Sequence, residues 1–186
     1  MKEVVWLAFN FWRSAPTKIK RILTIIVFFF LSIIIMVAGV LTPLSLEEAN
    51  EIERELEEIR GNVNTQLIFG NNFMICLLMF VPIAGPIFGS YVLYSTGVVI
   101  AAESIAEGLP SVIVFLFLFV FPFTWLEFLA YSIAFAQSIW LTWRITQHRG
   151  KRELLNTCVF ISTCAVMLLV AAIIEMVIIL YLGGLG

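Results

Sequence analysis

Glu127 is the residue best suited to chemistry in this sequence, because it is the one charge in the apolar run from Ser111 to Trp143. A carboxylate within an apolar membrane segment costs a few kcal/mol and is normally kept with a partner. It could relay an ion or proton, or line a cavity. Alternatively, it stays protonated or is hydrogen-bonded to Asn71, Asn72 or Tyr131, which would pin one helix to another. We favour this structural interpretation, since no second carboxylate or histidine lies near it in the sequence.

The other polar residues in apolar surroundings have simpler interpretations. We expect Glu175, about two turns before the end of the last apolar run, to reach the interface or an ion-pair partner. One residue of the Asn71–Asn72 pair is expected to cap the N-terminus of the second span. The other is expected to reach a neighbouring helix, with Glu127 as its candidate partner.

No complete catalytic or metal-binding set is found in the sequence. His148 lies among basic residues, with no acid or second histidine beside it. Cys76, Cys158 and Cys164 lie in apolar runs without CxxC spacing, which favours buried thiols over a metal site or disulfides. A hydrolase needs a nucleophile with a base, or two converging carboxylates. We therefore expect no enzyme activity, no metal and no cofactor. Nucleic-acid binding is not expected either, because the basic residues form short clusters and no basic face.

The elements that must position these residues are membrane helices. The 186 residues are 61% apolar and only 13% charged, with a mean hydropathy of +1.04. That much apolar surface cannot be hidden inside one water-facing globule. The alternation with period two that a barrel needs is absent, so the predicted fold class is all-α: a polytopic transmembrane bundle of about five spans. The lipid bilayer is therefore the first predicted partner.

The uncharged runs set the span boundaries, and proline sets the breaks. Pro82 to Pro86 predicts a turn between the second and third spans. The 33 residues from Ser111 to Trp143 are too long for one straight crossing, so Pro122 should break them. Either the span is kinked there, or a half-helix over 111–121 leads into the real crossing, which we favour. The predicted spans are Ile22–Leu41, Leu67–Val81, Ile87–Ala102, Pro122–Trp143 and Leu154–Tyr181.

Small residues accompany these breaks. Gly85, Gly89 and Gly97 on the third span allow a neighbouring helix to approach closely, or allow a bent backbone to line a cavity. We expect packing to be their main role. The same reasoning makes Pro82, Pro86 and Pro122 helix-break residues.

Two segments are expected outside the hydrocarbon. Residues 1–21 combine aromatic and basic side chains, which is typical of a helix lying in the membrane interface. The segment 44–61 has apolar residues at helical spacing and a capping box formed by Ser45 and Glu48, which predicts an amphipathic acidic helix. The sequence supports two interpretations of its acidic face equally: a simple solvated surface, or a surface that docks a partner.

Charge distribution predicts the orientation. All thirteen acids are Glu, and seven of them lie between Glu47 and Glu58, whereas Lys and Arg collect before the first span and between the last two. The positive-inside rule places the N-terminus and the loop 144–153 in the cytoplasm and the acidic loop 44–66 outside. The predicted location is a cell membrane, crossed several times.

The central half of the chain resembles the stage II sporulation protein M family of polytopic membrane proteins. The resemblance covers roughly Gly70 to Ala136. It rests on the Asn-Asn pair at 71–72, on Phe80, Pro82, Gly85 and Gly89, on Tyr94 to Gly97, on Pro110, and on PFTWLEFLAYSIA from Pro122 to Ala134. Many relatives have His-Gly directly after this proline, where this chain has Phe123 and Thr124. Glu127 matches the family pattern.

The resemblance implies a non-enzymatic membrane component. In spore formers the family's namesake works with peptidoglycan-degrading partners during engulfment and anchors them, whereas relatives also occur in organisms that never sporulate. Our leading hypothesis is a helical scaffold that binds itself or other membrane proteins through small-residue helix faces. The acidic helix and the aromatic N-terminal segment would then serve as docking surfaces. The alternative is a small channel or transporter in which Glu127 lines a polar cavity between broken helices.

Overall fold

A computed structural model of the chain describes residues 16–60, 64–148 and 150–183. All regular structure in these ranges is helical, which agrees with the predicted class. The predicted interfacial helix of residues 1–21 lies largely outside the described residues, and its last residues belong to the first described helix. The helices are α2 (Thr17–Val40), α3 (Leu46–Arg60), α4 (Thr65–Met79), α5 (Ala84–Ala106), α6 (Ser111–Leu118), α7 (Pro122–Thr146) and α8 (Gly150–Gly183).

The described part of the chain contains three single helices long and apolar enough to cross a membrane: α2, α5 and the stretch Glu153–Tyr181 of α8. The bent pair of α6 and α7 makes a fourth candidate if it is counted as one span. The fifth apolar helix, α4, has 15 residues, about 22 Å of helix, which is shorter than a hydrocarbon core of about 30 Å. These elements correspond to the predicted bundle of about five spans, with α4 too short to cross alone.

The start of α4 differs from the prediction. Asn64 is the N-cap residue, and its Oδ1 accepts a hydrogen bond from the backbone N–H of Leu67 at 2.9 Å. The helix includes Thr65 and Gln66 as its first turn, so the pair at 71–72 lies inside the helix. The expected capping role of this pair is therefore wrong, because Thr65 and Gln66 already form the first turn of the helix.

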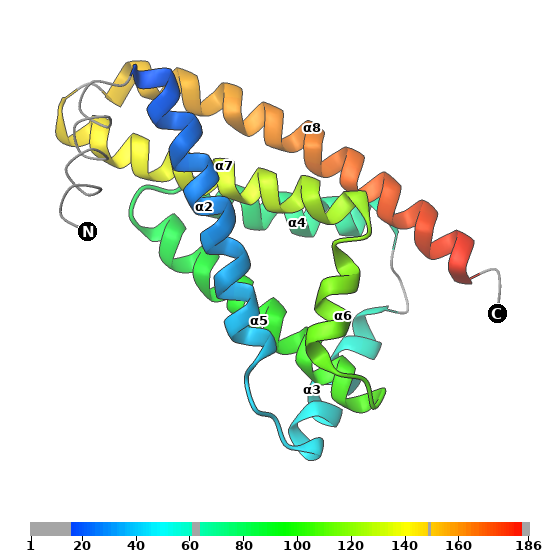
Figure 1. Ribbon diagram of the computed structural model, residues 1–186. Helices are drawn as coiled ribbons and strands as arrows, with labels where there is room; N and C mark the ends of the chain where they lie inside the picture. The colour runs from blue at the N-terminus through cyan, green and yellow to red at the C-terminus, as the bar shows by residue number, and fades with distance from the viewer. Residues whose placement is uncertain (1–15, 61–63, 149, 184–186) are drawn as a thin grey trace.

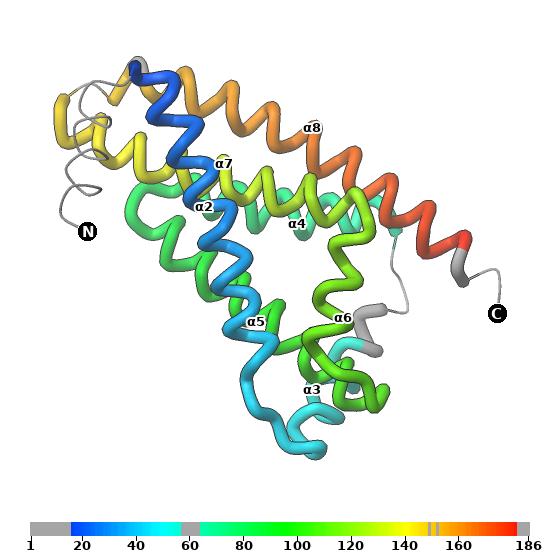
Figure 2. Tube along the Cα trace, in the orientation of Figure 1, coloured from blue at the N-terminus to red at the C-terminus, as the bar shows by residue number. Residues whose placement is uncertain are grey.

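The break at Pro122 is a corner and not a mild kink. Helices α6 and α7 are bent by 85° relative to each other, with Pro122 as the first residue of α7 (Figure 2). At the end of α6, the Leu118 oxygen accepts from the Phe121 N–H at 3.1 Å and from Thr124 Oγ1 at 2.8 Å, and the Phe119 oxygen accepts from Trp125 Nε1 at 2.8 Å. The half-helix interpretation is the one that the structure supports.

Helix α7 holds the bundle together. Figure 1 shows α2 and α5 side by side, and α4, α7 and α8 running together in a different direction. α7 contacts α2, α4, α5 and α8. Many of its buried positions carry small side chains, including Ala130, Ser132, Ala134, Ala136 and Ser138. Such residues let helices approach closely where no hydrophobic effect drives association in lipid.

The helix-break and small residues predicted from the sequence lie at turns or at helix contacts. A Cβ on Gly97 would collide with the backbone of α2 at Met36 and Gly39, so α2 and α5 are in direct backbone contact there. A Cβ on Gly85 would collide with the Met79 carbonyl, and one on Gly89 would meet the Phe135 ring. Pro82 lies in the turn between α4 and α5, Pro86 lies in the first turn of α5, and Pro122 begins α7.

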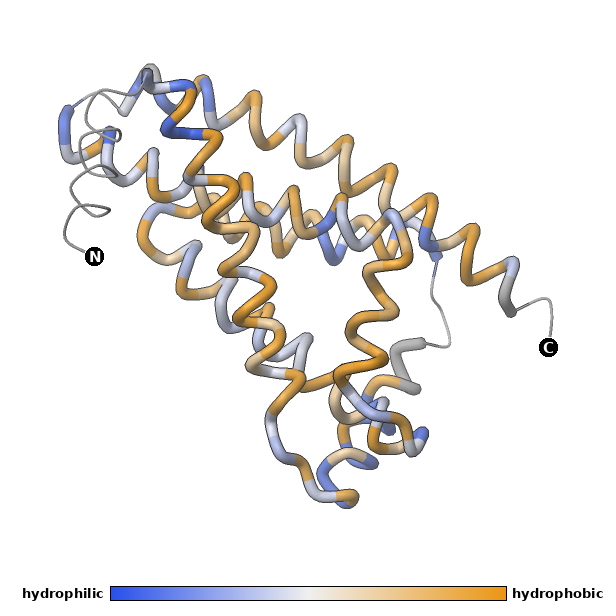
Figure 3. Tube along the Cα trace, viewed as in Figure 1, coloured by the Kyte–Doolittle hydropathy of each residue, from blue (hydrophilic) through white to orange (hydrophobic). Residues whose placement is uncertain are grey.

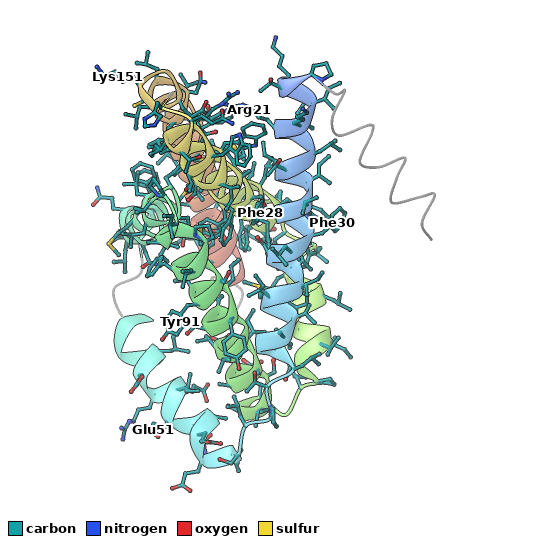
Figure 4. The ribbon with its side chains drawn as sticks, turned by 90° about the vertical axis from the view of Figure 1, so that its left-hand side faces the viewer. Arg21, Phe28, Phe30, Glu51, Tyr91 and Lys151 are labelled. Atoms are coloured by element: carbon teal, nitrogen blue, oxygen red, sulfur yellow. The ribbon has the colours of Figure 1, made fainter. Side chains whose placement is uncertain are left out.

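The hydrophilic segments gather at two opposite ends of the molecule. Figure 3 shows them where α2 begins, α7 ends and α8 begins, and again around α3. In Figure 4, Arg21 and Lys151 lie at the first end and Glu51 at the other. Between these ends, α2 exposes large apolar side chains such as Val27, Phe30 and Ile34, as expected for a surface in contact with lipid.

The capping box predicted at the start of α3 is present. Glu48 Oε2 accepts hydrogen bonds from the backbone N–H of Ser45 at 2.8 Å and from the Ser45 hydroxyl at 2.7 Å, while the Glu48 N–H donates to Ser45 Oγ at 3.3 Å. These bonds, the backbone one first, favour the carboxylate and lower the pKa of Glu48 below its ordinary value. The hydrogen bonds between Ser45 and Glu48 thus fix the N-terminal end of α3.

Candidate functional site: two polar clusters between apolar helices

The first polar cluster joins α4 to α7 through Asn72 and Glu127. Asn72 Nδ2 donates a hydrogen bond to Glu127 Oε1 at 2.6 Å. Both residues are half-buried, and Glu127 lies in the second turn of α7, close after the corner at Pro122. The amide therefore supplies a partner to a carboxyl group that would otherwise face an apolar environment.

The other members of the predicted cluster are less directly involved. Asn71 is exposed on the neighbouring face of α4, and no hydrogen bond is found for it in the described part of the chain. Tyr131 lies one turn after Glu127 on α7 and packs against the apolar core. Glu175 of α8 is half-buried and near enough to Glu127 to interact with it electrostatically. The second carboxylate that the sequence did not reveal near Glu127 thus comes from α8.

Two buried thiols lie beside this cluster. Cys76 of α4 and Cys164 of α8 are fully buried, and both Sγ atoms point at the carbonyl oxygen of Ala130 on α7, at 4.0 and 3.5 Å. They are the buried thiols predicted from the sequence. Cys158 differs, because its side chain is exposed on the outer surface of α8. An apolar surrounding in the sequence does not separate a core position from one that faces lipid.

The second cluster lies at the basic end and joins three helices. Arg21 of α2 donates from Nη2 to both carboxylate oxygens of Glu153 on α8, at 2.6 and 2.7 Å, and from Nη1 to Gln137 Oε1 on α7 at 3.0 Å. Gln137 Nε2 donates to Glu153 Oε1 at 2.7 Å and to Thr157 Oγ1 at 2.9 Å. Gln137 and Glu153 are 3% and 4% exposed, so neither can rely on water for its hydrogen bonds.

The Trp140 ring packs against this network and contacts two of its arginine side chains. The Arg21 guanidinium lies over the Trp140 ring, 5.1 Å from its centroid, and the Arg144 guanidinium lies 5.8 Å from the same centroid. The Trp140 indole N–H also approaches Thr24 Oγ1 on α2 at 3.4 Å. Cation–π contacts of this kind are worth about 0.5–2 kcal/mol, depending on desolvation. Trp140 therefore adds a further link between α2 and α7.

Each of the two clusters connects helices of the bundle. The Asn72–Glu127 bond ties α4 to α7, and the network around Glu153 ties α2, α7 and α8. Neither contains a nucleophile paired with a base. No group of three or more His, Cys, Asp or Glu that could hold a metal ion occurs among the described residues.

Sequence reasoning missed the second cluster. The sequence indicates only an interfacial and topological role for Arg21 and a topological one for Arg144, and it singles out neither Gln137 nor Glu153. Two features of the sequence could have pointed to this cluster. Gln137 is a polar residue in the apolar run of α7, and Glu153 is an acid directly after the basic residues that precede the last span. Linking them to Arg21 requires knowing that the start of α2 lies against the end of α7, which sequence spacing does not give.

Comparison with known proteins agrees with the family resemblance and extends it. The family model described as stage II sporulation protein M matches residues 25–178. The match includes the acidic helix and most of the first and last spans, in addition to the central segment. No curated protein and no solved structure matches the chain. Because the family model covers well over half of the chain, the protein belongs to the stage II sporulation protein M family.

Proposed function

We propose that this protein is a non-enzymatic membrane scaffold or anchor, and that the acidic face of α3 is its contact surface for other proteins or for a second copy. The observation that carries the proposal is the form of α3: a capped helix held against the bundle, with a row of carboxylates directed away from it. Family membership supports a membrane component of this kind.

The placement of α3 supports a contact surface better than a simple solvated loop. Ala49 is fully buried, and α3 packs on α5. Glu47, Glu51 and Glu55 are exposed and follow at intervals of four residues, so they share one helix face. Keeping three like charges on one face opposes helix formation slightly, and a basic partner surface would offset this repulsion.

The small-residue helix faces are less suited to partner binding than the sequence suggests, because they already contact other helices of the chain. Gly97 is used against α2, Gly89 against Phe135 of α7, and Gly85 against the end of α4, all within the same chain. Those faces are therefore occupied inside the monomer. We therefore place partner binding at the acidic face of α3.

The proposed contact surface requires a defined orientation of the protein in the membrane. The basic end, with Lys18, Lys20 and Lys151 exposed or half-buried, would face the cytoplasm, and α3 would face the exterior. A partner that docks on α3 would then be an extracytoplasmic protein or domain with a basic surface.

Purification in mild detergent tests the proposal. A triple variant, Glu47→Lys, Glu51→Lys and Glu55→Lys, reverses the acidic face, and Glu107→Lys serves as a control at another exposed carboxylate. We expect the wild-type protein and the control to be isolated as an oligomer or with a companion, and the triple variant to lose that association. A wild-type protein recovered only as a monomer without companions would refute the proposal.

The rival function, a channel or transporter, is favoured by one specific observation. The chain is non-helical at 80–83 and at 119–121, next to the helices that carry Asn72 and Glu127. Transporters use such breaks to form sites at membrane depth. Proteoliposome flux that is abolished by Glu127→Gln would support this rival, whereas a substitution that changes only thermal stability would leave Glu127 a structural residue.

A further inference from the structure

A pocket at the basic end of the bundle has the features of a lipid-headgroup site. Its volume is about 460 Å³, and it lies between the first turns of α2 and the last turns of α7. Lys20 and Thr17 line it from α2, and Trp140, Trp143, Arg144 and Gln147 from α7. Small-ligand pockets commonly measure about 300–1,000 Å³, so the size suits a headgroup.

The pocket is electropositive because its nearest acid is already neutralised. Both oxygens of Glu153 accept from Arg21 Nη2, whereas Arg144 Nε lies 4.0 Å from Glu153 Oε2 and makes only this longer contact with the carboxylate. The Lys20 ammonium forms no ion pair among the described residues. Arg21 thus takes up the charge of Glu153 and leaves Lys20 and Arg144 as two cations facing one cavity.

The rim of the pocket suits an acyl chain. Trp143 and Ile139 are more than one-third exposed and line the same opening. Amphipathic tryptophan side chains collect at the level of lipid headgroups, and basic pockets between membrane helices bind anionic headgroups. A lining that combines two cations with exposed apolar side chains matches a molecule that has a phosphate at one end and a hydrocarbon chain at the other.

We propose that this pocket binds the phosphate-bearing headgroup of an anionic phospholipid, with Lys20 and Arg144 as the phosphate-binding residues. Gln147 and Thr17 can supply neutral hydrogen bonds to the same headgroup. The bound lipid would lie between α2 and α7 and would bridge the helices that Arg21 already joins. This site is independent of the acidic face of α3 and of the scaffold function.

The test uses the full-length protein, stripped of lipid in detergent and then incubated with phosphatidylglycerol, with phosphatidylcholine or with inorganic phosphate. Lipid adducts are counted by native mass spectrometry, and affinity is taken from their concentration dependence. We expect phosphatidylglycerol to bind more tightly than phosphatidylcholine, and inorganic phosphate to compete only weakly. Each neutralised cation should weaken binding about fivefold, and Lys20→Gln with Arg144→Gln should weaken it more than either single substitution.

Matched controls separate this site from general attraction to a basic surface. Lys18→Gln and Lys151→Gln remove exposed cations that do not line the pocket and should leave affinity unchanged. Lys20→Arg with Arg144→Lys keeps both charges and should retain binding, which would attribute the loss in the Gln variants to the missing charges. Equal losses in the controls, or unchanged binding in the double Gln variant, would overturn the proposal. Inorganic phosphate binding as tightly as the lipid would overturn its lipid part.

Discussion

Replacing Glu153 with Gln would leave the Arg21 guanidinium without its carboxylate partner in the network that joins α2, α7 and α8. Three hydrogen bonds reach that carboxylate, two from Arg21 and one from Gln137. Removing one partner of a buried ion pair costs about 3–5 kcal/mol. Because the Arg21 side chain is 16% exposed and the Gln amide still offers one acceptor, the lower end, about 3 kcal/mol, applies here.

A loss of this size changes the folding equilibrium by about a hundredfold or more, which is easily measured. The assay is reversible unfolding in detergent micelles, followed by circular dichroism as SDS is added. Lys18→Gln is the control, since it removes an exposed cation from the same end of α2 and should stay within about 0.5 kcal/mol of wild type. A Glu153→Gln variant as stable as this control would refute the assignment.

The double variant Arg21→Met with Glu153→Met separates the ion pair from its surroundings. Apolar replacements of a whole buried pair are often neutral or stabilising, whereas a single removal strands a charge. We therefore expect the double variant to be more stable than either Arg21→Met or Glu153→Met alone. If its loss equals the sum of the two single losses, the two residues do not act as a pair.

Three further predictions concern the helix contacts, each checked by the same unfolding titration. Asn72→Ala should lower the free energy of unfolding by about 0.6–1.7 kcal/mol, whereas Glu127→Gln, which keeps an acceptor for Asn72, should lower it less. Equal losses would show that the hydrogen bond between Asn72 and Glu127 does not stabilise the fold. Thr124→Val should cost about 1 kcal/mol, because the Leu118 carbonyl at the corner loses one of its two donors and keeps only the Phe121 N–H; no change would mean that the hydroxyl hydrogen bond does not stabilise the corner. Gly97→Leu should prevent stable folding, since even a Cβ collides with α2, while Gly70→Ala, in open space, should not.

The sequence predicts the helical class, the main spans and the break at Pro122 because these depend on local features: apolar runs, proline and charge. The acidic helix is predicted for the same reason, through its capping box and its spacing. Asn72 and Glu127 could be named as candidate partners because polar groups in lipid need each other. That they are in fact bonded is a tertiary property of α4 and α7.

Long-range contacts account for what sequence reasoning missed. Arg21 and Gln137 are 116 positions apart, and Arg21 and Glu153 are 132 apart. No local pattern links residues at such separations. The length of α4 was also misjudged at its start, because the polar residues Thr65 and Gln66 continue the helix beyond the apolar run. Likewise, an apolar run does not tell which cysteine is buried between helices and which faces lipid.

The central claim is that apolar helices cross the membrane with the basic end inside and α3 outside. Cysteine accessibility tests it most directly, in a background where Cys76, Cys158 and Cys164 are replaced by alanine. We expect Glu51→Cys to react with a membrane-impermeant maleimide on intact cells, and Lys151→Cys to react only after the membrane is opened. Labelling of Lys151→Cys from outside, or of both positions from the same side, would contradict the account.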